Sequence, residues 1–171
     1  MTPIYAHIAV VGTGAMGRGI AQIAAQAGST VTLYDTHAAA MTAAQQAINS
    51  LWDKLQEKGR MDSEAVAACK NRLQCANSLR DLAGCDLVVE AIVEKLEVKA
   101  ALFAELEDIM RPDAVLASNT SSLDVDVLAR ASGRADRYLG LHFFSPAHVM
   151  KLMEVARGQA SAADALATGL A

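Results

Sequence analysis

The sequence VGTGAMGRGIAQ, from Val11 to Gln22, indicates the fold of this chain more clearly than any other stretch. A short apolar run, His7 to Val11, leads into its first glycine and predicts a strand, and the segment from Met16 to Ala27 carries apolar residues at helical spacing. A strand, the pattern G-x-G-x-x-G and a helix, in this order, are typical of a dinucleotide-binding fold. The start of the helix, at Met16, offers free N–H groups and a positive dipole end to a phosphate.

Three glycines of this stretch have separate tasks. Gly12 permits a tight turn, Gly14 lets the backbone approach a pyrophosphate, and Gly17 lets the helix pack closely on the strand. A second strand, predicted at Thr30 to Tyr34, ends in Asp35, where an acid is expected to meet the ribose hydroxyls of NAD. No arginine stands beside Asp35, so the sequence predicts NAD rather than NADP as the cofactor.

The rest of the chain alternates between strand and helix patterns. We predict further strands at 72–76, 86–90 and 114–117, and helices at 62–70, 95–110, 124–131 and 161–170. A long second helix is predicted by an apolar stripe of Met41, Ala44, Ile48, Leu51 and Leu55. The alternation predicts an α/β fold of the Rossmann type, a doubly wound, mostly parallel sheet with helices on both faces.

Two apolar runs near the C-terminus, Tyr138 to Phe144 and Leu152 to Ala156, predict a last pair of strands. Only about eight residues join them, whereas a parallel crossover needs a dozen or more, so the last strand should run antiparallel. That return brings Glu154 close to His142. A carboxylate beside a histidine can fix its tautomer and favour its protonated form, which suits a general base. The simpler alternative is a histidine that caps a strand, with a surface glutamate nearby.

A polar run, Asn119 to Ser122, follows the predicted strand at 114–117. In open α/β sheets ligands bind at the carboxyl ends of the strands, where small amide and hydroxyl side chains can orient a carbonyl group or a nicotinamide amide. The same residues also make an ordinary loop and helix N-cap. The run therefore either contacts a ligand or only forms the loop and the N-cap of the next helix.

These segments resemble the 3-hydroxyacyl-CoA dehydrogenase family in four motifs, which follow one another along nearly the whole chain. The motifs are VGTGAMGRGIAQ (Val11–Gln22), VVEAIVEKLEVK (Val88–Lys99), SNTSSL (Ser118–Leu123) and GLHFFSPAHVMKLMEV (Gly140–Val155). The resemblance implies NAD-dependent, reversible oxidation of a 3-hydroxyacyl-CoA to a 3-oxoacyl-CoA, as in the β-oxidation of fatty acids. It implies His142 as the catalytic base, Glu154 as its partner, and Ser121 as a contact to substrate and nicotinamide.

The resemblance also implies contacts to the cofactor and to CoA. Glu94 and Lys99 should contact NAD, and Lys58, after the long second helix, should contact CoA. The full set of expected cofactor-binding residues is Gly12, Gly14, Met16, Gly17, Asp35, Glu94, Lys99, Asn119, Ser121 and Ser145. Ser145 departs from the family, which usually has asparagine there; serine keeps one hydrogen-bonding hydroxyl but reaches less far.

Two of these assignments have simpler alternatives in the residue types. Glu94 and Lys99 stand near the start of the predicted helix at 95–110, where the helix dipole alone favours an acid. The basic residues between 54 and 60 could meet the phosphates of CoA or could form a solvated face.

Composition fits a compact enzyme domain. The 171 residues are enough for one core, and the net charge of −4, with acids and bases interspersed, does not suggest a nucleic acid or an anionic membrane as partner. We recognise neither a membrane-spanning run nor a signal peptide. The three cysteines are odd in number and lack metal-binding spacing, which predicts reduced thiols, no metal site and a cytoplasmic location.

We expect residues 1–171 to form one NAD-binding domain. In the family, a final strand and an all-helical domain follow, which form the homodimer and close over the acyl-CoA; this chain is therefore expected to be the N-terminal piece of a longer, dimeric protein and poorly active alone. Two other functions remain open. One is a non-catalytic NAD-binding or structural protein, since a fold does not establish activity. The other is a dehydrogenase of a small β-hydroxy acid, whose base would more naturally be a lysine on a later helix.

Overall fold

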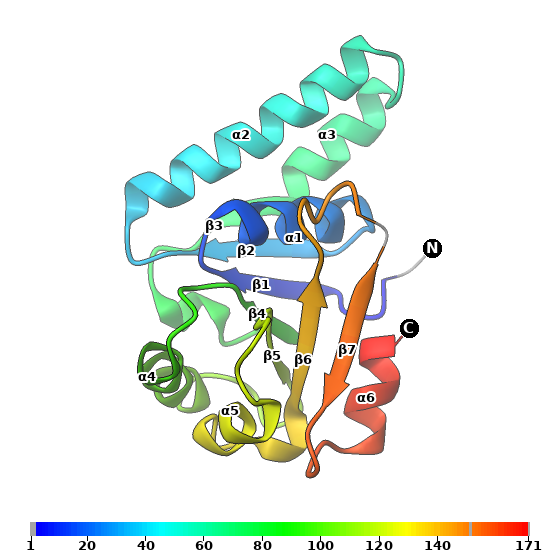
Figure 1. Cartoon of the computed structure of the whole chain (residues 1–171). Coiled ribbons are helices and arrows are strands. Elements are labelled where there is room, and N and C mark those ends of the chain that lie inside the picture. Colours follow the sequence, from blue (N-terminus) through cyan, green and yellow to red (C-terminus); the bar gives the residue numbers. More distant parts are fainter. Residues whose placement is uncertain (1–2, 151, 171) are drawn as a thin grey trace.

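The computed structural model describes residues 3–150 and 152–170, and these form a seven-stranded sheet (Figure 1). The strands are β1 (His7–Val11), β2 (Thr30–Tyr34), β3 (Leu73–Cys75), β4 (Leu87–Glu90), β5 (Val115–Ser118), β6 (Tyr138–Phe143) and β7 (Met153–Arg157). Their order across the sheet is β3-β2-β1-β4-β5-β6-β7, and every neighbouring pair is parallel except β6 and β7. The prediction of a Rossmann-type, mostly parallel sheet with a late antiparallel strand is confirmed.

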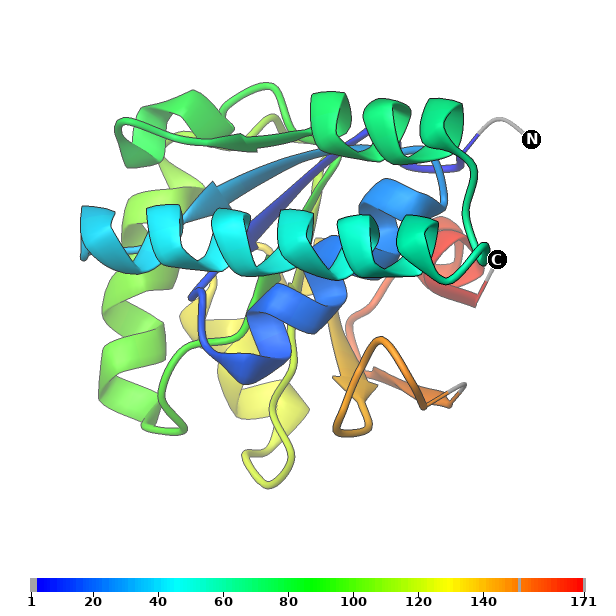
Figure 2. The same cartoon turned by 90° about the horizontal axis from the view of Figure 1, so that it is seen from above.

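Helices cover both faces of this sheet. They are α1 (Ala15–Gln26), α2 (Ala38–Glu57), α3 (Ser63–Arg72), α4 (Leu96–Glu107), α5 (Val125–Ala131) and α6 (Ala163–Leu170), with short 3-10 helices at Leu79–Leu82 and Ala135–Arg137. The buried side chains of α1, α2, α3 and α6 form one core cluster, and those of α4 and α5 form a second cluster across the sheet. The α2–α3 pair extends away from the sheet, and both helices run side by side (Figure 2).

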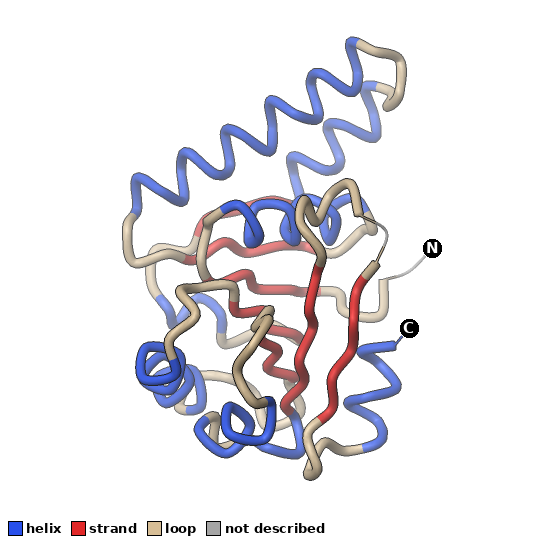
Figure 3. The backbone as a smooth tube through the Cα atoms, in the orientation of Figure 1, coloured by secondary structure: helices blue, strands red, loops and turns tan. Residues whose placement is uncertain are grey.

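The parallel arrangement brings the carboxyl ends of β1, β2, β4, β5 and β6 to one edge of the sheet. Figure 3 shows the loops that leave these strands at this edge. In open α/β sheets this edge holds the ligand, at the point where the strand order reverses. That point lies between β1 and β4 here, because the chain first winds outward from β1 to β3 and then continues from β4 on the other side.

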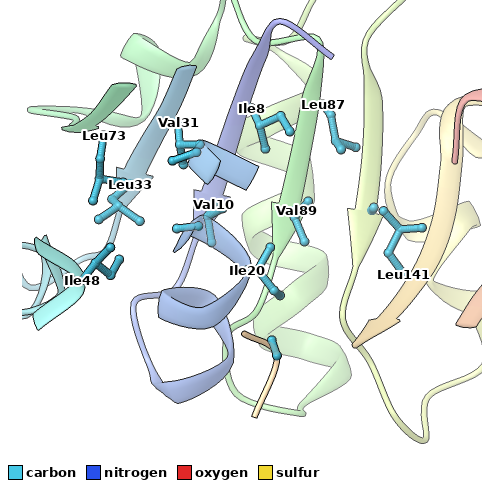
Figure 4. Packing of buried hydrophobic residues seen from close by; sticks show 14 of the residues in the cluster. Ile8, Val10, Ile20, Val31, Leu33, Ile48, Leu73, Leu87, Val89 and Leu141 are labelled. Carbon is cyan, nitrogen blue, oxygen red and sulfur yellow. The ribbon is translucent and has the colours of Figure 1, made fainter. Parts of the chain in front are cut away.

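The strands are almost continuously apolar, because helices cover both faces of the sheet. On the face of α1, Val10, Leu33 and Val89 point toward Ile20 of α1 and Ile48 of α2 (Figure 4). Full burial of one such side chain stabilises the fold by about 1.5–3 kcal/mol. This packing fixes the position of α1 and therefore of the loop that precedes it. No helix in the described ranges combines the length and the apolar character that a membrane span requires.

The predicted strands at the N-terminus agree with β1 and β2, and the other predicted elements differ by one to three residues at their ends. The apolar stripe on α2 was predicted wrongly in part. Leu51, expected in the stripe, is 36% exposed, and Trp52 is fully buried in its place. Trp52 lies one helical turn after Ile48, on the same side of the helix, so Ile48 and Trp52 together face the core.

Candidate functional site

The turn between β1 and α1 requires glycine at two positions for steric reasons. Gly12 has φ +94°, which a side chain disfavours, and a Cβ added there would lie 2.6 Å from the carbonyl oxygen of Ala91. A Cβ on Gly17 would lie 1.8 Å from the carbonyl oxygen of Gly12. Gly14, in contrast, borders open space, and α1 begins with neither a side-chain cap nor an acid in its first turn. The free N–H groups at this helix start therefore fit a pyrophosphate.

Asp35, directly after β2, is held toward this turn. Its Oδ2 accepts hydrogen bonds from the backbone N–H of Thr13 at 2.9 Å and from the Thr13 hydroxyl at 2.8 Å, and its Oδ1 accepts one from the N–H of His37 at 3.1 Å. Partial burial raises the pKa of Asp35, but the hydrogen bonds from Thr13 and His37 outweigh it and hold the pKa below its ordinary value. Asp35 is therefore a fixed, ionised acceptor beside the glycine turn.

A cleft of about 270 Å³ adjoins Asp35. Its walls are largely apolar and come from β1, β2, the loop after β4, and α4; they include Tyr34, Ile92, Val98 and Leu102. An apolar slot beside a carboxylate can take a flat aromatic ring while the acid binds an attached sugar. The turn, the acid and the cleft together fit the adenosine half of a dinucleotide.

His142 and Glu154 form a hydrogen-bonded pair across the antiparallel strands. They are register partners of β6 and β7, and His142 Nδ1 lies 2.9 Å from Glu154 Oε2. Ser121 Oγ lies 3.2 Å from the other ring nitrogen, Nε2. A carboxylate can only accept here, so Nδ1 carries the proton and Nε2 is left as the basic nitrogen. The His142 side chain is 26% exposed, so Nε2 is accessible to a small reacting group.

Glu94 organises the turn that carries Ser121. Its Oε1 accepts hydrogen bonds from the Thr120 hydroxyl, from the backbone N–H of Ser121 at 2.9 Å and from that of Ser122 at 3.2 Å. Partial burial raises the pKa of Glu94, but the hydrogen bonds from Thr120, Ser121 and Lys99 outweigh it and lower the pKa to about 2. Helix α4 begins at Leu96, so Glu94 lies two residues before its first turn.

Lys99 lies behind this turn rather than in the open site. Its side chain is 1% exposed, and its Nζ donates to both carboxylate oxygens of Glu90, at 2.6 and 2.8 Å. Glu94 Oε2 lies 3.2 Å from the same nitrogen. The structure holds Glu94 and Lys99 together in an ion-paired cluster with Glu90, and their expected contact with NAD stays a prediction.

The remaining candidates are distributed around the edge. Asn119 Oδ1 accepts the backbone N–H of Phe143 at 2.9 Å, which ties the loop after β5 to β6. The side chain of Met16 packs partly buried against the core. Ser145 is exposed and lines a cleft of about 310 Å³ between α1 and α2, and Lys58 is exposed at the end of α2.

Sequence reasoning missed Glu90 and Ser118. Both are fully buried at the carboxyl ends of neighbouring strands, and the Ser118 hydroxyl donates to Glu90 Oε2 at 2.6 Å. The one available signal was an acid at the end of an otherwise apolar strand, since a buried carboxylate requires a partner. Neither the partner nor the distance could be read from the sequence, because Lys99 reaches Glu90 only through the packing of α4.

The glycine turn, the acid after β2 and the ligand edge at the strand reversal define a dinucleotide-binding domain of the Rossmann class. Within this class, a family model described as "3-hydroxyacyl-CoA dehydrogenase, NAD binding domain" matches residues 7–171. The chain belongs to this family, and its cofactor is NAD.

Individual relatives agree with the family match. A probable 3-hydroxybutyryl-CoA dehydrogenase of Deinococcus radiodurans is 44% identical over 87% of this chain and 53% of its own length. A 3-hydroxyadipyl-CoA dehydrogenase of Escherichia coli is 43% identical over 92% of this chain and 33% of its own length. The crystal structure of an E. coli 3-hydroxybutyryl-CoA dehydrogenase superposes with a TM-score of 0.94 at 41% identity, over 96% of this chain and 35% of the other. The chain thus spans between a third and about half of these relatives.

Proposed function

We propose that this domain binds NAD and supplies the general base for the reversible oxidation of a 3-hydroxyacyl-CoA to a 3-oxoacyl-CoA. The observation that carries the proposal is the line formed by Ser121, His142 and Glu154, with contacts of 3.2 and 2.9 Å. This line lies at the same sheet edge as the glycine turn and Asp35. A histidine buttressed by a carboxylate is suited to accept a proton while hydride leaves the adjacent carbon.

In the proposed oxidation, His142 Nε2 takes the proton of the C3 hydroxyl, and the C3–O bond becomes a carbonyl as the C3 hydrogen leaves with its electron pair. Bound NAD supplies the acceptor for that hydride. Glu154 keeps the Nδ1 proton in place and stabilises the imidazolium that forms. The Ser121 hydroxyl, beside Nε2, orients the C3 oxygen by a hydrogen bond. In the reverse direction the imidazolium returns the proton.

Cofactor and CoA contacts complete the proposal. Asp35 binds the ribose hydroxyls of the adenosine half and repels a 2′-phosphate, which favours NAD over NADP. Gly12, Gly14 and Gly17 and the main chain at Met16 receive the pyrophosphate, and Asn119, Ser121, Glu94 and Ser145 line the nicotinamide side. Lys58 meets a phosphate of CoA as a point charge.

The proposal also covers the oligomeric state, the substrate and the location of the whole protein. We infer that residues 1–171 form one NAD-binding domain of a homodimeric protein that acts on an acyl-CoA in the cytoplasm. The three free cysteines, Cys69, Cys75 and Cys85, are compatible with a reducing compartment. Because His142 and Ser121 lie at an open edge, this domain alone should bind cofactor and turn over acyl-CoA poorly: positioning of substrate supplies much of the rate and requires contacts on more than one side.

Single-turnover kinetics test the reaction class. The domain in excess is mixed with NADH and either acetoacetyl-CoA or free acetoacetate, and NADH oxidation is followed at high protein concentration, where even slow turnover is measurable. We expect oxidation with the thioester and none with the free acid. Equal rates with both substrates would favour a dehydrogenase of small β-hydroxy acids. The domain can also be placed in a full-length relative in exchange for that relative's own NAD-binding domain. If NADH binds but neither substrate is turned over, by the domain alone or by this chimera, a non-catalytic NAD-binding protein would be favoured.

A further inference from the structure

A buried ion pair lies behind the turn that carries Ser121. The Lys99 ammonium is surrounded by four acceptors: both oxygens of Glu90 at 2.6 and 2.8 Å, Glu94 Oε2 at 3.2 Å, and Ser118 Oγ at 3.4 Å. An ammonium has three N–H donors, so the protein itself uses all of them. With 1% of its side chain exposed, Lys99 lies almost fully enclosed beneath the turn that carries Ser121.

Glu90 fixes the ammonium from the sheet side. Its side chain is fully buried, and besides Lys99 it accepts the backbone N–H of Ile92 at 2.7 Å and the Ser118 hydroxyl at 2.6 Å. These partners come from the loop after β4 and from β5, so Glu90 is held by two separate elements. A buried charge without its counterion is costly, which makes Lys99 and Glu90 mutually dependent.

Glu94 links this pair to the exposed turn. One of its oxygens faces Lys99, and the other collects donors from three successive residues, Thr120 to Ser122. The side chains of Ser121 and Ser122 are exposed, and the turn is neither helix nor strand. Its main chain is therefore tied to the domain largely through the Glu94 carboxylate.

We propose that Lys99 is a positioning residue for the His142 site. Its ammonium, fixed by Glu90, orients Glu94, and Glu94 in turn holds the turn so that Ser121 Oγ points at His142 Nε2. This inference rests on the proposed function in one respect: it takes Ser121 and His142 as the residues that act on the substrate. The positioning itself is a property of the free domain and can be measured without ligand.

The test removes the ammonium without leaving a buried charge. The double variant Glu90→Gln/Lys99→Met makes both partners neutral at similar size, so it is expected to fold, whereas Lys99→Met alone leaves Glu90 unpaired. Backbone amide hydrogen exchange, measured by NMR, reports the turn residue by residue. We expect the amides of Ser121 and Ser122 to exchange at least about tenfold faster in the double variant, while core amides such as that of Val10 keep their wild-type rates.

A matched control comes from a second ion pair that does not contact the turn. Arg134 is 6% exposed and its Nε lies 2.5 Å from Glu107 Oε2. The variant Glu107→Gln/Arg134→Met removes a buried cation that also donates to the carbonyl oxygens of Arg111 and Ala114, so it perturbs the core at least as strongly. Its turn amides should still exchange as in the wild type. An equal acceleration at Ser121 in both double variants would show general loosening and would overturn the proposal.

The ring signal of His142 supplies a second, spectroscopic readout. Ser121→Ala removes the hydroxyl beside Nε2 and defines the signal of a ring without that contact. The Glu90→Gln/Lys99→Met variant should move the His142 signal in the same direction as Ser121→Ala. The double variant could instead leave the His142 signal and the amide exchange of the turn unchanged while its affinity for NADH falls by about tenfold or more. That result would make Lys99 a cofactor contact and not a positioning residue. Because exchange is measured without substrate, absence of turnover in the wild type would contradict only the proposed function.

Discussion

Acid titration of Glu94 gives the most quantitative prediction from this structure. The pKa of Glu94 is lowered from an ordinary value of 4.5 to about 2, so its carboxylate stabilises the folded state above pH 4.5 and loses that contribution as the pH falls toward 2. Linkage at 1.36 kcal/mol per pKa unit sets an upper bound of about 3.4 kcal/mol. Because the Glu94 side chain is 36% exposed, solvent screening reduces this to about 1–2 kcal/mol.

The perturbation is Glu94→Gln, which keeps an oxygen acceptor for the turn but cannot titrate. Urea unfolding of the wild type and the variant is measured from about pH 6 to about pH 3, and the difference in unfolding free energy isolates Glu94 from the other carboxylates. The variant should be less stable by about 1–2 kcal/mol at neutral pH, and the gap should narrow by more than half at about pH 3. A gap that is absent at neutral pH, or constant across the range, would refute the role assigned to this carboxylate.

Three further predictions concern the cofactor turn and the buried pair. Asp35→Ala should weaken NADH binding by about 1–3 kcal/mol in calorimetry, since it removes a charged acceptor, and wild-type binding of NADPH as tight as that of NADH would contradict the choice of cofactor. Lys99→Met should lower the free energy of unfolding by about 3–5 kcal/mol, and adding Glu90→Gln should restore most of it; no rescue would show that the unpaired charge is not the cause. Gly17→Ala should abolish or severely weaken NADH binding in the same titration, because its Cβ would overlap the carbonyl oxygen of Gly12; wild-type affinity would show that the turn can relax.

The features that could be predicted from the sequence are those with a local or short-range cause. The glycine turn after β1 follows from steric needs of a few adjacent residues, and the short connection between β6 and β7 forces an antiparallel return that pairs His142 with Glu154. Register then places the two side chains on the same face. The strand pairing that the sequence predicts therefore brings His142 and Glu154 into contact, at 2.9 Å.

Features that depend on how separate elements approach each other could not be predicted. Leu51 and Trp52 are adjacent on α2, and helical spacing alone does not decide which of two neighbouring apolar residues faces the core. The contact of Lys99 with Glu90 joins α4 to the end of β4, and the role of Glu94 depends on the turn after β5. These distances are set by packing across the sheet, so the sequence pointed to residues of the site but not to the support beneath it.

The central claim is that His142 is the general base of a dehydrogenase site, and His142→Gln tests it most directly. Single-turnover oxidation of NADH by acetoacetyl-CoA is compared between wild type and variant, with NADH affinity measured in parallel. The account predicts a rate loss of about two orders of magnitude or more, with NADH affinity little changed, because the base acts on the substrate proton and not on the cofactor. A variant that retains a rate within a few-fold of the wild type would contradict the account.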